Sequence, residues 1–482
     1  MNFKLLLPEI ILFSGALIIL IADVFFNKKN QRFPFFAHFF SLIICGLALS
    51  FAVKSFGAPQ LSFNDGFKLT AIICFFKSII ISLLTVIILI SIRYVFLLPK
   101  YSSEYLALLM IATVGGLIMV SANDLLVFYL GLELQALSLY LLASFTVKSP
   151  KSSEAGIKYF ILGSLASGIL LFGISLVYGY FSTINLAQIN DFVTNTKIAE
   201  IPVGGIFGII MVITAMFFKI SASPFHMWAP DVYQGSPTSV LAFFGTVVKF
   251  STIMALILIV NNATWHIVAQ ILLFVAMASV IVGSFGAIFQ TNIKRLMAFS
   301  SISHVGFILL ALASLQKSAI ESAIFYTIIY AVISLGSLSF LTIFKSPDDH
   351  ENDSTDDKIF NINSLAGLSK TNPVMAMCFA VLMFSSAGIP PLAGFFSKFY
   401  VIKSMILGGN LVLAVIVVIF SAISSFYYLR IVKIMYFDQP NNQLELEDYG
   451  NTRLVVLLCA LANLGFILVI DILNNSISNF LN

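Results

Sequence analysis

"MFFKISASPFHMW", residues 216 to 228, lies inside a stretch of sequence that is otherwise apolar. It places Lys219 and Pro224 where a membrane-spanning helix is expected. Because Pro224 cannot donate a hydrogen bond to the carbonyl of Ile220, and its ring clashes there, the helix must kink or break. Backbone groups freed at membrane depth need water or side chains, so interrupted helices occur where they line a cavity. The stretch therefore predicts a broken helix beside a buried polar site.

The rest of the chain has the composition of an integral membrane protein. Of its 482 residues, 59% are hydrophobic and only 10% are charged, whereas soluble domains carry about 25% charged residues. Apolar runs of about 20 residues, enough to span a bilayer, recur throughout. There are fourteen, centred near residues 15, 44, 80, 112, 135, 169, 213, 248, 278, 305, 331, 388, 421 and 462. A β-barrel would show short alternating segments instead, so we predict an all-α polytopic membrane protein with about 14 transmembrane helices.

The loops between these runs alternate in basic content, which predicts orientation because cytoplasmic loops are enriched in lysine and arginine. One set of loops holds fifteen basic residues and the other holds six. The richer set comprises Lys28, Lys29, Arg32, Arg93, Lys100, Lys148, Lys151, Lys294, Arg295, Lys345, Lys358, Lys370, Arg430, Lys433 and Arg453. The poorer set comprises Lys4, Lys54, Lys68, Lys197, Lys317 and Lys403. We therefore expect both termini on the outer side of the membrane.

The remaining basic residues lie within apolar runs. They are Lys77, Lys158, Lys219, Lys249 and Lys398, and one glutamate, Glu133, joins them. A lysine at the centre of a spanning helix costs about 2.5 to 3.5 kcal/mol, so such residues are functional candidates by default. Glu133, in "YLGLELQALSLYLLAS", is expected to pair with Lys219. Lys77 is alone in the third span, and snorkelling to the interface is its simpler explanation.

A second interrupted helix is predicted by "SSAGIPPLAGFFSKFYV", residues 385 to 401, which ends in a segment containing Lys398. The two interruptions fall in the seventh and twelfth spans, and an offset of five spans reverses the direction of entry into the membrane. Broken helices in corresponding positions of inverted repeats mark a transport path. We therefore predict two inverted five-helix repeats, each containing a broken helix: residues 101–260 (spans 4 to 8) and 261–440 (spans 9 to 13, with an acidic cytoplasmic loop at 345–372). A three-helix segment at 1–100 precedes them and one span at 441–482 follows.

Two histidines and the polar loop complete the candidates. His304, in "SSISHVGF", titrates near neutral pH when unperturbed and can relay protons; the alternative is a core histidine bonded to a backbone carbonyl. His226 follows Pro224 and lies either at the helix break or near the cytoplasmic mouth. The loop "KSPDDHENDSTDDKIFN", residues 345 to 361, is expected to be solvated and mobile rather than a docking site.

Four segments together resemble a known family. They are "GLELQALSLYLL", "FKISASPFHMWAPDVYQGSPT", "NIKRLMAFSSISHVGF" and "GIPPLAGFFSKFYV". With the fourteen expected spans, they resemble the antiporter-like membrane subunits of proton-pumping bacterial NADH:quinone oxidoreductase, respiratory complex I. Within that family the chain is most similar to the N subunit. The similarity to N rests on the "LLPEI" start, the length, a lysine at Lys398 where the M subunit carries a glutamate, and the lack of a long C-terminal lateral helix.

The resemblance implies roles for individual residues. Glu133 and Lys219 match the family's charge pair, Lys158 and Lys249 its connecting lysines, and Lys398 the lysine of the second broken helix. His304 falls on the hydrophilic axis between two half-channels. The resemblance assigns no role to Lys77, and the acidic stretch at 347–357 would be a lineage-specific insertion. Protons are then expected to move along these buried side chains, driven by redox chemistry elsewhere.

No redox centre or metal site is predicted in this chain. Its four cysteines, Cys45, Cys74, Cys378 and Cys459, are scattered singly, and no nucleotide-binding fingerprint appears. The resemblance implies FMN, iron–sulfur clusters and quinone in partner subunits, which include neighbouring antiporter-like subunits and the peripheral subunits of complex I. It also implies the bacterial inner (plasma) membrane. A net charge of +4 gives no indication of nucleic acid.

Two other functions stay open at this point. An Mrp-type cation/proton antiporter subunit shares the same core, and sodium movement that needs no NADH would favour it. The other alternative is a non-transporting membrane scaffold, in which the buried charges only hold helices together. Neutral substitutions of Lys219 and Lys398 that preserve pumping would favour the scaffold.

Overall fold

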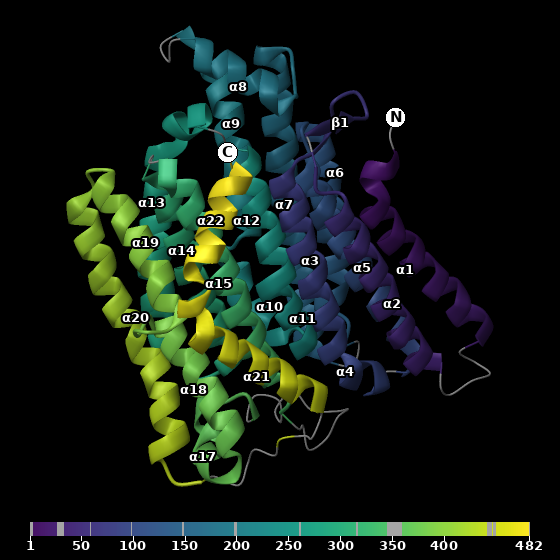
Figure 1. Ribbon diagram of the computed structural model, residues 1–482, viewed down its shortest axis with the longest axis vertical. Helices are drawn as coiled ribbons and strands as arrows, with labels where there is room; N and C mark the ends of the chain where they lie inside the picture. Colours follow the sequence, from purple (N-terminus) through teal and green to yellow (C-terminus); the bar gives the residue numbers. More distant parts are fainter. Residues whose placement is uncertain are drawn as a thin grey trace. The chain divides into compact units, whose positions relative to one another are not determined.

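The computed structural model describes residues 3–26, 33–57, 59–97, 99–146, 149–196, 200–259, 262–314, 317–344, 359–440, 446 and 450–481. The chain is 85% helical, and one small antiparallel hairpin pairs β1 (Gln60–Ser62) with β2 (Phe67–Leu69) (Figure 1). The acidic stretch of the predicted cytoplasmic loop, at 345–358, lies outside the described residues. The all-α prediction is confirmed.

The helices follow one another along the chain with short connections. They are α1 (Leu7–Phe26), α2 (Phe33–Lys54), α3 (Ala71–Ile90), α4 (Ile92–Leu97), α5 (Ser102–Ser121), α6 (Leu125–Ala143), α7 (Pro150–Phe181), α8 (Leu186–Asn195), α9 (Val203–Lys219), α10 (Trp228–Gly235), α11 (Thr238–Phe243), α12 (Lys249–Ile259), α13 (Asn262–Ile288), α14 (Ile293–Ala313), α15 (Lys317–Leu341), α17 (Leu368–Thr371), α18 (Pro373–Ala387), α19 (Ala393–Leu407), α20 (Leu411–Phe437), α21 (Gly450–Gly465) and α22 (Ile470–Leu481).

Twelve helical segments of the described chain are long and apolar enough to cross a membrane. The sequence suggested fourteen spans, and the other two, near residues 213 and 388, contain the shorter apolar helices α9 and α18. Each of these two helices stops at an interruption inside its span. The difference in count therefore reflects the predicted helix breaks, because a broken span contains no single helix of full membrane length.

The chain forms two compact units. The first unit comprises residues 1–145, 156–220 and 247–268, and the second comprises 146–155, 221–246 and 269–482. In the first unit, α5 packs against α1, α3, α6 and α12. Gly115 allows the closest of these approaches, because a Cβ atom there would lie 2.5 Å from the backbone nitrogen of Gln135 on α6.

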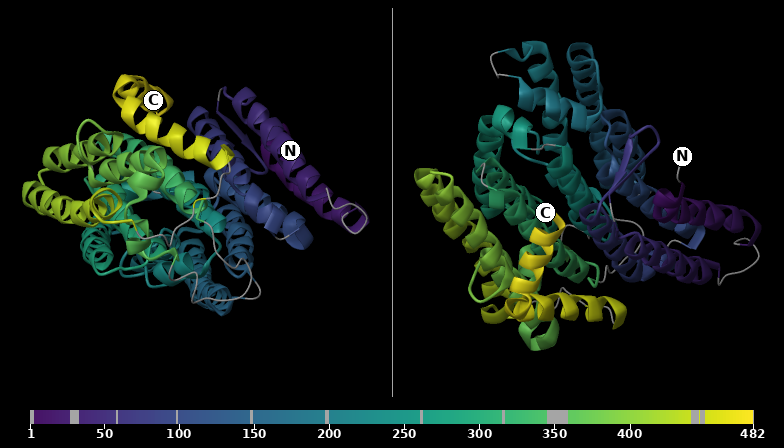
Figure 2. Two further views of the ribbon diagram at one scale, coloured as in Figure 1. Left: turned by 90° about the horizontal axis from the view of Figure 1, so that it is seen from below. Right: turned by 45° about the horizontal axis from the view of Figure 1, so that its top comes forward.

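In the second unit, α15 packs against α11, α14, α18, α19 and α21. In the most apolar stretch of α14, 94% of the residues are buried, whereas only 28% are buried in that of α20. The views in Figure 2 agree, since α20 runs along the edge of this unit. The second unit therefore has a helix at its centre, α14, that carries polar residues where neither lipid nor solvent reaches them.

In the described part of the chain, three irregularities lie beside the buried lysines Lys219, Lys249 and Lys398, and two of them were predicted. The chain leaves helical geometry between α9 and α10, where Ser221 has a φ of 59°, and between α18 and α19, where Gly388 has a φ of 88°. The third was not predicted: a π-helical turn, residues 244–248, joins α11 to α12 immediately before Lys249. Such turns insert one residue into a helix and occur frequently at functional sites.

Candidate functional site

Lys219, the last residue of α9, is buried in the first unit and contacts a tyrosine on α6. Lys219 is 8% exposed, and its ammonium donates to the hydroxyl oxygen of Tyr140 at 3.3 Å. Gly163 on α7 makes room for this hydroxyl, because a Cβ atom at Gly163 would lie 2.1 Å from it. The hydroxyl of Tyr140 is therefore held between α7 and the lysine.

Glu133 lies on the same helix as this tyrosine, α6, seven residues earlier. It is half-buried, and the hydroxyl of Ser167 on α7 donates to its Oε1 atom. Ser167 also lies within interaction range of the Tyr140 hydroxyl. No direct ion pair joins Glu133 to Lys219, both of which the structure describes. The predicted pair is therefore connected indirectly, through Ser167 and Tyr140.

Sequence reasoning did not identify Tyr140 or Ser167. The spacing of Glu133 and Tyr140 was the available signal, because residues about two turns apart lie on one face of a helix. Ser167 gave no comparable signal, since its position opposite Glu133 depends on how α7 packs. Hydroxyl groups both donate and accept hydrogen bonds, so the two side chains form a path along which a proton can pass.

The other two lysines of the first unit lie on neighbouring helices. Lys158 is half-buried on α7, the helix that also carries Ser167. Lys249 is 3% exposed and begins α12 directly after the π-helical turn. α12 packs against α9, the helix that ends at Lys219. Gln135 links α6 to α12 by donating to the hydroxyl of Ser251 at 3.1 Å.

His304 lies on α14 in the second unit, among tyrosines. Its Nδ1 is 2.8 Å from the hydroxyl of Tyr326 on α15, and its Nε2 is 3.0 Å from the hydroxyl of Tyr428 on α20. Both ring nitrogens of His304 therefore face tyrosine hydroxyl groups. A neutral imidazole has one donor and one acceptor nitrogen, and a tyrosine hydroxyl can take either role. His304 can thus exchange tautomers between the same two partners.

A small cavity of about 20 Å³ adjoins His304. Its lining is rich in hydroxyl groups: Tyr233, Ser300, Tyr330, Ser334, Ser337 and Ser386, with Met297, Ile333 and Leu338 completing it. A space of about 10 to 15 Å³ is enough for one water molecule where polar groups surround it. The cavity is thus suited to a bound water that extends the hydrogen-bonded path from His304.

Lys398 lies at the second helix break, as predicted. It is 5% exposed and donates to the carbonyl oxygen of Ala387, the last residue of α18, at 2.9 Å. This carbonyl is one of those that the interruption frees. Ser385 stabilises the other side of the break, because its hydroxyl accepts from the backbone nitrogen of Gly394 at 3.0 Å and donates to Asn463 at 2.8 Å.

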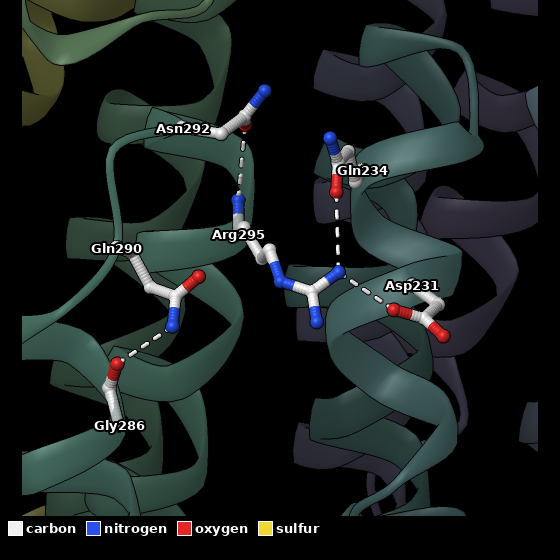
Figure 3. A network of polar contacts seen from close by, with 6 residues as sticks. All are labelled: Asp231, Gln234, Gly286, Gln290, Asn292 and Arg295. Atoms are coloured by element: carbon white, nitrogen blue, oxygen red, sulfur yellow. Dashed lines mark hydrogen bonds and ion pairs between the residues drawn. The ribbon is translucent and has the colours of Figure 1, made fainter.

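A polar network fixes the short helix that follows the first break (Figure 3). Arg295, in the first turn of α14, contacts Asp231 on α10 at 2.6 Å and Gln234 at 3.2 Å. The side chain of Asn292 caps α14 and accepts from the backbone nitrogen of Arg295 at 3.3 Å (Figure 3). The sequence assigned Arg295 only to a basic loop, and its partner Asp231 was missed. The network joins α10 to the helix that carries His304.

Two further residues left open by the sequence are placed by the structure. His226 lies in the turn between α9 and α10, at the helix break, with its ring 6.4 Å from that of Phe299. Lys77 does not snorkel: its side chain is 1% exposed and forms an ion pair with Glu9 at 2.5 Å. Snorkelling was the wrong explanation, because Glu9 of α1 supplies a buried carboxylate that holds the ammonium inside the unit. Among the described residues, no three His, Cys, Asp or Glu side chains gather as metal ligands.

The chain is similar to known proteins over most of its length. Residues 122–424 match the family model described as NADH:quinone oxidoreductase/Mrp antiporter, TM. NADH-quinone oxidoreductase subunit N 1 of Rhizobium meliloti (strain 1021) is 40% identical over 475 residues, which cover 97% of this chain and 95% of that protein.

Solved structures have the same fold. A chain in respiratory complex I from Thermus thermophilus with bound aureothin is 25% identical, with a TM-score of 0.79 and coverage of 97% of this chain and 98% of that one. A chain of the Mrp complex from Dietzia sp. DQ12-45-1b, 18% identical, has a TM-score of 0.76 and coverage of 100% and 98%; it is similar in fold alone. The chain therefore belongs to the membrane-subunit family shared by NADH:quinone oxidoreductases and Mrp antiporters, in its subunit N branch.

Proposed function

We propose that the chain is a proton-translocating membrane subunit of a bacterial NADH:quinone oxidoreductase, respiratory complex I. The observation that carries this proposal is the hydroxyl path between Glu133 and Lys219 beside a broken helix. A lysine also lies at the second break, where Lys398 binds a freed carbonyl. The subunit N relative supports the assignment to this complex.

In the first unit, the proton switch is the distance between Glu133 and Lys219. An ammonium group in low-dielectric surroundings is costly, and a nearby carboxylate offsets that cost. When the Glu133 charge approaches, Lys219 holds its proton. When the charge withdraws, Lys219 releases the proton toward Lys249, and the hydroxyls of Ser167 and Tyr140 deliver the next proton to Lys219 as each passes its own proton onward. Lys158 and Lys249 exchange protons with this path.

In the second unit, His304 and Lys398 carry the proton. Tyr326 and Tyr428 contact the two ring nitrogens, so His304 takes a proton on one nitrogen and gives up the one on the other. We place the order of transfer as Lys219, Lys249, His304 and Lys398. The order follows from the proposed arrangement in two inverted repeats, residues 101–260 and 261–440, between the segments 1–100 and 441–482.

The energy for transport comes from partner subunits. Moving one charge against 100 mV costs about 2.3 kcal/mol. FMN, iron–sulfur clusters and quinone in the partner subunits would supply it, and this chain responds by pumping. The chain lies in the bacterial plasma membrane with both termini on the outer side, next to other antiporter-like subunits.

The alternative is a subunit of an Mrp-type cation/proton antiporter, which the fold of the Dietzia complex favours. The two functions differ in what drives transport. Sodium-dependent proton movement in vesicles without NADH would indicate the antiporter. NADH-dependent acidification that is insensitive to sodium would indicate the oxidoreductase.

The test is proton pumping per NADH oxidised in membrane vesicles, comparing the unmodified complex with a Lys219→Ala variant whose assembly is confirmed on a native gel. Pumping should fall while the complex stays intact. Lys403→Ala is the matched control, because Lys403 is an exposed lysine on α19. Unchanged pumping in Lys219→Ala would show that this lysine is structural and that the path lies elsewhere.

A further inference from the structure

A second buried acid–base pair lies outside the residues that the proposed path uses. Glu9 is in the first turn of α1, and Lys77 is in the second turn of α3. The Oε1 and Nζ atoms are 2.5 Å apart, and the two side chains are 4% and 1% exposed. Both helices pack against α2 and α5 within the first unit. A fully buried charge pair is seldom kept for stability, because apolar side chains of similar volume stabilise as well or better.

The surroundings of this pair are unusual for a structural ion pair. Among the described residues, neither carboxylate oxygen of Glu9 nor the ammonium of Lys77 has a hydrogen-bond partner in addition to the pair itself. The ring of Phe67, which is 3% exposed, covers the ammonium with its centroid 4.7 Å away. In the part of the chain that the structure describes, each charge therefore has the other as its one charged or hydrogen-bonding partner. A proton that moves from Nζ to Oε1 converts ammonium and carboxylate into amine and carboxylic acid, and the pair becomes neutral without any other change.

Phe67 connects the pair to the α5–α6 turn. It belongs to β2 and forms a bridge with Ala122, at the end of α5. The next residue, Asn123, donates from its backbone nitrogen to the carbonyl of Gly66 at 3.0 Å and from its side chain to that of Asp65 at 2.8 Å. α6, the helix of Glu133, begins two residues later. The residues that precede α6 are thus hydrogen-bonded to the hairpin whose Phe67 ring covers Lys77.

The helix of Lys77 also packs against the helix of Lys249. The neighbouring residue on α3, Phe76, makes an edge-to-face contact with Phe250 on α12, at 6.2 Å between ring centroids. Phe250 follows Lys249 directly. The start of α1 and the hairpin lie at the same end of the first unit (Figure 1). The basic-residue pattern predicts that this end faces the outer side of the membrane.

We propose that Glu9 and Lys77 form a proton-release site at the hairpin end of the first unit, with Phe67 as its cover. The pair takes up a proton from the lysines of the path. It gives the proton to water at the outer surface when the hairpin shifts, and then returns to the ammonium–carboxylate form. This inference rests on the proposed pumping function and extends it, since it supplies an exit that the buried path lacks.

The test uses the assembled complex in vesicles. Glu9→Gln with Lys77→Met removes both charges together, which avoids leaving one buried charge without its partner. We expect a complex that assembles and oxidises NADH but loses as large a fraction of pumping per NADH as Lys219→Ala does. Exchange of the two residues, Glu9→Lys with Lys77→Glu, keeps an acid and a base in contact and should retain most of the pumping.

The matched control is Lys433→Met with Asp438→Asn. That pair has the same kind of contact, at 2.6 Å, but its side chains are 62% and 36% exposed, and pumping should be unchanged. Normal pumping in the Glu9→Gln, Lys77→Met complex would overturn the release site and make the pair structural. If Lys219→Ala also pumps normally, the proposed path itself is wrong, so the two failures are distinguishable.

Infrared spectroscopy provides a test that does not depend on assembly of the neutral variant. The NADH-induced difference spectrum of the unmodified complex should contain a carboxylic acid C=O band that shifts in Glu9→Asp. A spectrum that is the same in both complexes would show that Glu9 does not change protonation during turnover, and the inference would fail.

Discussion

Lys398 donates to the carbonyl oxygen of Ala387, eleven residues earlier, at 2.9 Å. The contact joins the first residues of α19 to the last residue of α18 across the interruption between them. One side chain thereby satisfies a carbonyl that the break exposes and places a titratable nitrogen at the same point. The helix break and the buried lysine are therefore one structural feature.

Substitution of Lys398 should affect both stability and transport. Lys398→Met leaves the Ala387 carbonyl without its partner, which costs about 1 to 3 kcal/mol for a buried polar group. We expect a lower thermal midpoint of the assembled complex and reduced pumping per NADH. Lys403→Met, on an exposed position of the same helix, should change neither. Full pumping in Lys398→Met would exclude this lysine from the path.

Removal of the Tyr140 hydroxyl should slow proton transfer without unfolding the chain. Tyr140→Phe keeps the ring and deletes the group between Ser167 and Lys219. General acid–base groups typically contribute about 10²- to 10⁴-fold to a proton-transfer step, so we expect at least a tenfold slower pumping rate at unchanged assembly. Tyr178→Phe, on an exposed position of α7, is the control. Equal rates in the two variants would show that the hydroxyl carries no protons.

Two glycines of α7 provide a matched stability experiment. Gly163→Ala places a Cβ atom 2.1 Å from the Tyr140 hydroxyl, whereas a Cβ atom at Gly168 meets nothing within 4 Å. Overpacking typically costs about 1 to 3 kcal/mol, so Gly163→Ala should lower the thermal midpoint and pumping. Gly168→Ala should be neutral or slightly stabilising because alanine has the higher helix propensity. Similar midpoints for the two variants would mean that Tyr140 can move away at no cost.

Substitution of a tyrosine beside His304 should reduce pumping more than substitution of a tyrosine elsewhere on the same helix. Tyr428→Phe removes the hydroxyl partner of Nε2 and keeps the hydroxyl of Tyr326 at Nδ1. We expect pumping to fall several-fold while NADH oxidation by the assembled complex continues. The control is Tyr436→Phe, on the same helix but 38% exposed. If both variants pump equally well, His304 does not use Tyr428.

The network in Figure 3 should have a small effect on stability and none on transport. The side chains of Arg295 and Asp231 are 34% and 32% exposed, and pairs of this kind contribute roughly 0.2 to 1 kcal/mol. Asp231→Asn should therefore shift the thermal midpoint slightly and leave pumping per NADH intact. Loss of pumping with normal assembly would instead show that the position of α10 controls the path.

The parts of the fold that the sequence predicted are those that depend on local physics. A proline such as Pro224 kinks or ends any helix that contains it. A lysine such as Lys398 is costly in any apolar run. Both breaks could therefore be located from a single segment. The hydroxyl path could not, because Ser167 meets Glu133 only through the packing of α7 on α6.

The pairing of Glu9 with Lys77 could not be predicted from the sequence either. It occurs in the segment "LLPEI" near the start of the first apolar run, where a glutamate is ordinarily assumed to reach water. Its burial against Lys77 depends on the positions of α1 and α3 around α5. The π-helical turn before Lys249 was equally hidden, since its residues, "FGTVV", have no sequence feature that distinguishes them from an ordinary helix.

That turn gives Lys249 a mechanical property of its own. An extra residue in a helix behaves as a dislocation does in a crystal lattice: it can be displaced by one position while the rows on either side keep their order. A helix advances by 3.6 residues per turn, so each residue that the dislocation passes rotates by about 100° around the axis. Lys249 is the residue next to it. A single step of the dislocation would turn this one ammonium group toward a different face of the helix, while both ends of the helix remain in place.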